Sequence, residues 1–216
     1  MTISPPVLKC GIVLLDPLTS AVKRVIVLQY NPDTLSRTLQ VQGTGEGQAD
    51  RSEVLRLKGP AVETIKVDAE IDATDQLETA KPGAQVLQSG IHPQLAALET
   101  ILYPSTAQLS ANHSMAAAGM LEILPMEAPL TLFVWSSSRI VPVRITEFSV
   151  TEEAFDTRLN PIRAKVSLGM RVLSVSDLGF DHRGSSIYLA YQRVKEAFAA
   201  VPTGGSLGQL GIGAIP

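Results

Sequence analysis

The residues most able to do chemistry together lie near the carboxyl end of the sequence, where Asp181, His182 and Ser185 stand close to one another. These are the three residue types of a hydrolase triad, in which histidine takes a proton from the nucleophilic serine. A triad normally draws its members from distant segments, whereas these three are local. We therefore expect a polar loop that caps the following helix, and no enzymatic activity.

The remaining candidates for ligand binding are weak. His92 and His113 have no acidic or cysteine neighbours at metal-ligand spacing. The glycines of GTGEGQ, which begins at Gly43, do not form G-x-G-x-x-G, so a flexible hairpin loop is expected there. An acidic run lacks the central glycine and closing glutamate of a calcium loop and is expected to be solvated: Asp68, Glu70, Asp72, Asp75 and Glu78. We expect neither a metal nor another cofactor.

The composition bounds the partners and the compartment. Eighteen basic and twenty-one acidic side chains give a net charge of −3, and the arginines are scattered, which disfavours nucleic acid as a partner. The single cysteine, Cys10, is expected to pack as a small apolar side chain in a reducing, cytoplasmic environment. The apolar run before Asp16 is too short for a membrane span or a signal peptide.

Alternation with period two predicts the strands that carry these residues. One strand at 64–72 places Ile65, Val67, Ala69 and Ile71 on a buried face and leaves a wet face of Thr64, Lys66, Asp68, Glu70 and Asp72. A second strand, at 162–172, alternates in the same way. Further strands are expected at 8–15, 22–30, 35–42, 130–135 and 141–150, the last with a β-bulge near Thr146 that keeps both of its apolar groups on the core side.

Two helices are expected. The first covers 92–103, with an apolar stripe of Leu95, Leu98, Ile101 and Leu102. The second covers 185–201, is capped by Ser185 or Ser186, and has a stripe of Ile187, Tyr191, Val194 and Phe198. Irregular stretches are expected at 43–54, 74–90 and 104–128. The chain is therefore predicted to be mainly β, a sandwich or barrel-like domain over 1–185, followed by the helix at 186–201 and a glycine-rich tail at 202–216.

Several segments in order resemble the tube and baseplate proteins of contractile injection systems, which are phage-tail-like particles. The segments are LQYNPDTLSRT, ETIKVDAEID, HPQLAALETILYP, PLTLFVW and the stretch from 141 to 173. The most specific parts are Asn31-Pro32 after a β-run and a later motif that contains Phe155, Asp156, Asn160, Pro161, Arg163, Ala164, Val166 and Leu168. The tube-initiator subunit is the closest type, although this chain has no counterpart of the LysM module of larger relatives.

The resemblance implies a structural subunit without cofactors, assembled in the cytoplasm into a six-membered ring that joins the inner tube to the spike or baseplate. Its partners would be copies of itself, inner-tube subunits, and spike or other baseplate proteins. The wet face at 64–72 would line the channel, and the subunit contacts would involve Tyr30, Asn31, Pro32, Trp135, Phe155 and Asn160. The residues by themselves leave two alternatives open. For the corner at 30–33, the alternative is an ordinary hairpin connection. For the whole chain, it is a soluble β-sandwich binding module for a glycan or peptide, with Trp135 and the long loops as its site.

Overall fold

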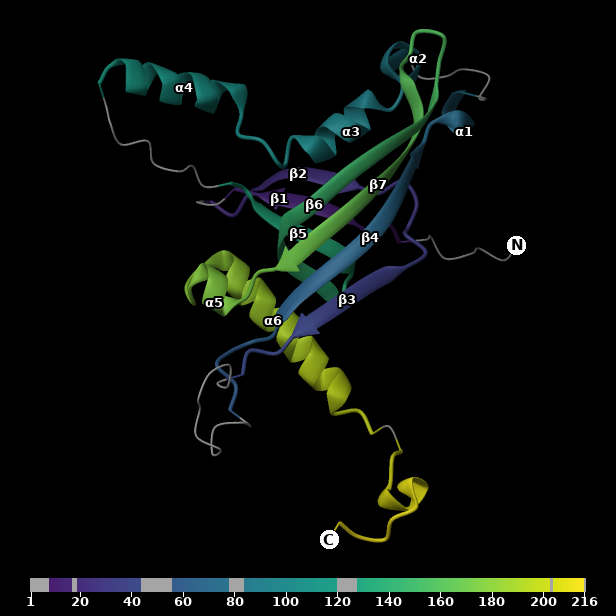
Figure 1. The fold of residues 1–216 in the computed structure, drawn as a ribbon, viewed down its shortest axis with the longest axis vertical. Coiled ribbons are helices and arrows are strands. Elements are labelled where there is room, and N and C mark those ends of the chain that lie inside the picture. Colours follow the sequence, from purple (N-terminus) through teal and green to yellow (C-terminus); the bar gives the residue numbers. More distant parts are fainter. Residues whose placement is uncertain are drawn as a thin grey trace.

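The computed structural model describes residues 8–16, 19–43, 56–77, 84–119, 128–202 and 204–215. Within these residues the strands form one seven-stranded antiparallel sheet in the order β2-β1-β5-β6-β7-β4-β3 (Figure 1). The strands are β1 (Gly11–Leu15), β2 (Val22–Val27), β3 (Leu35–Gln40), β4 (Val62–Asp72), β5 (Leu130–Ser136), β6 (Arg139–Phe155) and β7 (Pro161–Val172). The predicted mainly β class is confirmed, and the strands belong to a single sheet.

The three longest strands, β4, β7 and β6, lie side by side and set the register of the core. Val67 of β4 pairs with Leu168 of β7, which in turn pairs with Phe148 of β6. Since paired residues point to the same face, the apolar side chains form continuous rows. The register shifts between Ile145 and Glu147, so the predicted bulge is confirmed, and Phe148 packs against the core as expected.

The sheet curls so that its two ends approach each other. Edge strands β2 and β3 are consecutive in the sequence but do not pair, and the segment 28–34 crosses from one edge to the other. On the inside of this curl, Cys10 and Leu28 pack against Ala69 of β4, with Trp135 beside them. Burial raises the pKa of the Cys10 thiol. The alternative that the corner at 30–33 is an ordinary hairpin connection is therefore excluded, while the predicted burial of Cys10 is confirmed.

Helices complete the core at both ends of the curl (Figure 1). Near the ends of β4 and β6, α3 buries Leu95 and Leu98, and at the other end α6 buries Tyr188 and Tyr191. Within the described residues, no helix is both long and apolar enough to cross a bilayer. The helices are α1 (Thr74–Leu77), α2 (Ala84–Ser89), α3 (His92–Glu99), α4 (Thr106–Ala117), α5 (Val175–Leu178) and α6 (Arg183–Ala199), followed by the 3-10 turn η2 (Leu207–Leu210).

Three helical predictions need correction. The stretches expected to be irregular at 74–90 and 104–128 contain α1, α2 and α4, and the last begins at a capping box between Ser105 and Gln108. The predicted helix at 92–103 ends at Glu99, and Leu102 is exposed. The predicted stretch 43–54 lies, apart from Gly43, outside the described residues.

The last helix differs from its prediction in start, cap and buried face. Helix α6 begins at Arg183, so the predicted boundary between 185 and 186 falls inside its first turn, and its N-cap is His182 rather than a serine. Its buried stripe includes Tyr188 and Tyr191, whereas Phe198, expected to be buried, is exposed. Tyr191 faces inward because its hydroxyl donates a hydrogen bond to the buried Glu63 carboxylate, as described below.

Candidate interaction surfaces

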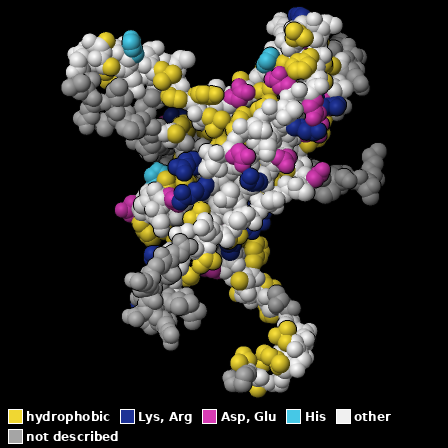
Figure 2. Space-filling model, in the orientation of Figure 1, with side chains coloured by type: hydrophobic (Ala, Val, Ile, Leu, Met, Phe, Trp, Pro, Cys, Tyr) yellow, Lys and Arg dark blue, Asp and Glu magenta, His cyan; other side chains and the backbone are white. Residues whose placement is uncertain are grey.

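The outer face of β4 carries the residues predicted to line a channel. Lys66, Asp68 and Glu70 are exposed there, and Thr64 and Asp72, nearer the two ends, are partly buried. Figure 2 shows acidic and basic side chains interspersed over the front of the sheet. The five residues share one face, as the alternation predicted. The role of this face as a lumen stays a prediction.

Ion pairs join β4 to β7, and β4 to β6 over the intervening β7, on this outer face, which we call the wet face. The Lys66 Nζ lies 2.9 Å from Glu147 Oε2 of β6, and the Arg163 Nε of β7 lies 2.7 Å from Asp72 Oδ2. The hydrogen bond from Lys66 to Glu147 raises the pKa of the lysine. The Lys66–Glu147 pair is exposed, and exposed pairs contribute about 0–1 kcal/mol each, so it does little for stability. With both signs interspersed, the wet face has no single-sign field that would attract a polyanion.

Two side-chain amides at the Asn31-Pro32 corner form hydrogen bonds to backbone groups that are distant in the sequence. The Gln29 amide both accepts a hydrogen bond from the Asp72 N–H (2.9 Å) and donates one to the Asp72 carbonyl oxygen, at a position of β4 that β3 does not reach. The Asn31 amide accepts from the Cys10 N–H (2.9 Å) and donates to the Leu8 carbonyl oxygen (2.7 Å). Each amide thus stands in for a backbone partner, and together they join the end of β4 to the segment that precedes β1.

Replacing Gln29 with alanine should lower the free energy of unfolding by about 1–2 kcal/mol. The substitution leaves the N–H and the carbonyl of Asp72 without their partner at a partly buried position. Urea denaturation followed by circular dichroism measures the change. The matched control is Gln40→Ala on the exposed end of β3, and an equal effect of the two substitutions would refute the bridging role.

The hairpin between β6 and β7 is tied to α2 by the motif around Asn160. The Asp156 carboxylate accepts hydrogen bonds from the Arg158 N–H (2.7 Å) and the Asn160 N–H (2.9 Å), and the Asn160 contacts lower the pKa of this carboxyl. The Asn160 amide also donates to the Gln88 carbonyl oxygen (3.2 Å), and the Arg158 guanidinium donates to the Leu87 carbonyl oxygen (2.6 Å). Asn160 therefore positions α2 within its own chain.

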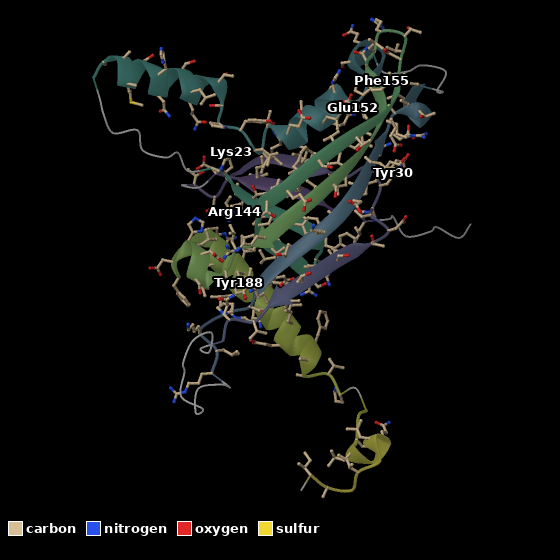
Figure 3. The ribbon with its side chains drawn as sticks, viewed as in Figure 1. Lys23, Tyr30, Arg144, Glu152, Phe155 and Tyr188 are labelled. Atoms are coloured by element: carbon tan, nitrogen blue, oxygen red, sulfur yellow. The ribbon has the colours of Figure 1, made fainter. Side chains whose placement is uncertain are left out.

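The other predicted contact residues are scattered over the molecule. Figure 3 places Phe155 near the tip of the β6–β7 hairpin and Tyr30 at the margin of the sheet, and both are exposed. Trp135 is partly buried, with its ring centroid 6.1 Å from that of Phe133, and packs against the core rather than offering a flat platform. The structure does not bring these residues into one site, and their role in subunit contacts stays a prediction.

A buried carboxylate, which the sequence prediction missed, holds α6 against the sheet. The Glu63 side chain is 4% exposed and lies 2.6 Å from the Arg37 Nε of β3 and 2.9 Å from the Lys195 Nζ of α6. The Tyr191 hydroxyl donates to the same carboxylate (3.1 Å), and the Lys195 Nζ lies 4.2 Å from the centre of the Tyr191 ring. Glu63 has the same parity as Ile65 and Val67, which was the signal available in the sequence.

Desolvation and pairing oppose each other at Glu63. Burial by itself raises the pKa of this carboxyl, but the hydrogen bonds and charges of Arg37 and Lys195 outweigh burial and hold the pKa below its ordinary value. Burial also raises the pKa of the Tyr191 hydroxyl, with the Glu63 charge acting in the same direction. The arrangement fixes a proton-free carboxylate among donors and leaves no group poised to exchange a proton with a substrate.

The Asp181, His182 and Ser185 group does not form a triad. The His182 Nδ1 accepts a hydrogen bond from the Gly184 N–H (3.0 Å), and the buried Ser185 hydroxyl donates to the Gly179 carbonyl oxygen. The ring nitrogen is used to cap α6, and the serine hydroxyl bonds to backbone rather than to the histidine. The predicted helix-capping loop is confirmed, with histidine as the capping residue.

One serine lies in a G-x-S-x-G pattern, Gly204 to Gly208, that the expectation of no hydrolase did not take into account. The pattern of a hydrolase elbow sits on a sharp turn between a strand and a helix. Ser206 instead follows α6 and opens the 3-10 turn η2, where its N–H donates to the Gln209 side chain (3.0 Å). Across the described ranges, no group of three or more His, Cys, Asp or Glu residues is arranged to hold a metal ion.

Comparisons with known proteins give no family assignment. No family model matches the chain, and no curated protein does. One solved structure, the tail of an empty GTA particle with C6 symmetry, is 11% identical with a TM-score of 0.30, and the match covers 76% of this chain and 90% of that one. Another, the virion of a native gene transfer agent particle, is 10% identical with a TM-score of 0.27 and the same coverage. Likenesses at these TM-scores carry no argument.

Proposed function

We propose that this chain is a non-enzymatic structural subunit of a phage-tail-like contractile injection particle. It forms a six-membered ring that connects the inner tube to the spike or baseplate, and it assembles in the cytoplasm. The observation that carries the proposal is that the two faces of the sheet differ. The inner face is packed against the chain's own helices, while the outer face of β4, β6 and β7 is hydrophilic. The sequence resemblance to tube and baseplate proteins supports the same conclusion.

The edges of the sheet support an assembly role. Strand β2 lies at one edge and exposes Val22, Val25 and Val27, an apolar surface that a monomer would be expected to protect. In a closed ring each such edge is covered by a neighbouring subunit. Tyr30 and Phe155 are the exposed aromatic members of the predicted contact set and are the ones that we propose as direct subunit contacts.

The wet face is the proposed lining of the channel. A mixed-charge surface interacts weakly with any one cargo and stays hydrated, which suits a passage rather than a binding site. Lys66, Asp68 and Glu70 are the exposed members of this lining on β4.

Reversing two charges on the wet face should impair passage without impairing folding. The variant Asp68→Lys/Glu70→Lys turns the exposed row of β4 wholly basic, so anionic cargo is held and cationic cargo is excluded. The free energy of unfolding should change by no more than about 1 kcal/mol, since the lost pairs are exposed. Translocation by assembled particles is the measurement, with Glu99→Lys on α3 as the control, and unchanged passage of both cargo types would refute the lumen assignment.

The mass and symmetry of the purified protein test the ring itself. Light scattering should give about six times the mass of one chain, and class averages of negatively stained particles should show six-fold rings or short tubes. A monomer at every concentration, also in the presence of the spike and inner-tube proteins, would contradict the proposal. Such a monomer that retained glycan or peptide binding would instead identify a binding module.

A further inference from the structure

We propose that the C-terminal arm, defined as residues 198–215, inserts into an apolar groove on a second copy of this chain. The groove, called the acceptor groove, lies between the α3–α4 connection and strands β1 and β2. The inference deepens the proposed function, because it names the contact that links one subunit of the ring to the next. It rests on three observations: an unpartnered apolar arm, a largely apolar groove, and their positions at opposite ends of the molecule.

The arm presents apolar side chains that its own chain does not cover. Leu210 and Ile215 are 74% and 76% exposed, and Phe198, Val201 and Ile212 are exposed as well. From Val201 to Pro216 the sequence has no charged side chain. A glycine-rich segment of this composition cannot build a core of its own, so its apolar groups need another surface.

The arm nevertheless carries local order. A capping box between Ser206 and Gln209 opens the 3-10 turn η2, and Gly211 closes it with φ of +74°. Leu207 and Leu210 stand at opposite ends of this turn, and Ile212 follows directly. A turn that is already formed loses less conformational entropy when it is bound than a free coil would.

The acceptor groove has the chemistry that an uncharged arm requires. Its volume is about 960 Å³, at the upper end of the usual range for binding pockets. Its apolar lining consists of Leu14, Ile101, Leu102, Tyr103, Pro104 and Pro129.

Two cationic side chains at the groove, Lys23 and Arg24, already have partners within the chain. The Lys23 Nζ lies 2.8 Å from Asp16 Oδ2, and the Arg24 guanidinium donates to the Thr100 hydroxyl (2.8 Å) and the Ala97 carbonyl oxygen (3.3 Å). An acidic partner would have to compete with these contacts, whereas an apolar, uncharged segment leaves them in place. The Arg24 charge has no carboxylate partner among the described residues, so it disfavours a basic occupant, and the uncharged arm meets no like charge there.

Position determines which copy the arm reaches. The arm continues from the end of α6, while the α3–α4 connection, which lines the acceptor groove, lies at the other end of the molecule (Figure 1). Figure 2 shows hydrophobic side chains gathered over the α3–α4 connection and on the end of the arm, far apart on the same molecule. An arm of one copy in the groove of the next is a head-to-tail contact, and contacts of that kind close into rings when the rotation allows.

Paired variants of the full chain test the contact. The arm variant Leu210→Asp/Ile212→Asp and the groove variant Leu102→Asp/Tyr103→Asp should each lower the fraction of assembled protein at least tenfold in light scattering. A mixture of the two should yield one-to-one dimers only, since one intact arm meets one intact groove and no second contact remains. The control is Phe180→Asp, an equally exposed apolar residue outside both surfaces, which should assemble normally.

A synthetic peptide of residues 202–216 separates this inference from the proposed function. It should bind the arm variant, whose groove is intact and empty, at least tenfold more tightly than it binds the groove variant, as measured by fluorescence anisotropy. Equal or undetectable binding to both variants would overturn the inference, and so would normal rings formed by the arm variant. If the unsubstituted chain forms no rings but the peptide still discriminates, the arm contact stands and the proposed ring fails.

Discussion

Replacing Glu63 with glutamine should lower the free energy of unfolding by about 2–3 kcal/mol. The amide cannot satisfy the Arg37 guanidinium and the Lys195 ammonium, which lie 2.6 and 2.9 Å from the carboxylate oxygens. Removing one member of a fully buried ion pair costs about 3–5 kcal/mol, because the other charge is left without compensation. The two cations here are 27% and 29% exposed, so water relieves part of that cost.

The pH dependence distinguishes this mechanism from a simple packing defect. Because the folded-state pKa of Glu63 lies below its ordinary value of 4.5, the carboxylate contributes fully to stability above the unfolded-state pKa. That contribution is lost as the pH falls through the lowered folded-state pKa. The difference between the native chain and Glu63→Gln should therefore be largest near neutral pH and shrink in acid, as measured by urea denaturation at several pH values.

The neighbouring surface carboxylate Glu196 supplies the matched control. Glu196→Gln removes a negative charge from the same helix at an exposed position, and it should change stability by no more than about 0.5 kcal/mol at any pH. If both substitutions had the same small effect, Glu63 would not be the group that holds α6 to the sheet.

A second large effect is expected at Gly90, where Gly90→Ala should destabilise the fold by about 3 kcal/mol. Gly90 has φ of +53°, a backbone conformation that costs a residue with a Cβ atom about 1–2 kcal/mol. The new Cβ would also overlap with the Pro161 carbonyl oxygen, which accepts a hydrogen bond from the Ile91 N–H (2.9 Å). Either α2 and α3 move away from the start of β7 or that hydrogen bond breaks.

Gly119 separates the two contributions at Gly90. It has φ of +81°, and nothing lies within 4 Å of the position that a Cβ atom would occupy. Gly119→Ala should thus cost only the backbone term of about 1 kcal/mol. Thermal and urea unfolding of the two variants measure the difference, and equal costs would show that the contact with Pro161 has no consequence.

The strands were predictable from the sequence because their signal is local. Alternation around Ile65 and around Val166 indicated one buried face, and the change of phase after Ile145 indicated the bulge. The connection at 28–34 was located as a corner but not understood, since Gln29 and Asn31 bond to Asp72 and Cys10, positions far away in the sequence. No pattern within the corner itself reveals those partners.

The buried face of α6 was predicted in part: Tyr191 is buried and Ile187 packs against a core cluster as expected, whereas Phe198 is exposed. The predicted stripe did not include Lys195, which turns inward together with Tyr191 to reach Glu63. Burying a carboxylate is unfavourable without partners, and hydrophobicity alone gives no reason to expect a lysine beside Glu63. Helix α4 was missed for the opposite reason: within the described residues it buries no side chain, so it has no periodicity to detect.

The placement of consecutive strands at opposite edges of the sheet has a consequence for the order of folding. The β6–β7 hairpin pairs residues close in the sequence, such as Phe155 and Pro161, whereas β1 must find β5 across the whole intervening chain, with Val13 opposite Leu132. Contacts between distant residues require a large loss of chain entropy before they contribute, so the β6–β7 hairpin is expected to form early and the local β1–β2 pair to dock onto β5 late. The last part of the sheet to close is then the edge that a neighbouring subunit would cover, and assembly could begin while that edge is still being completed.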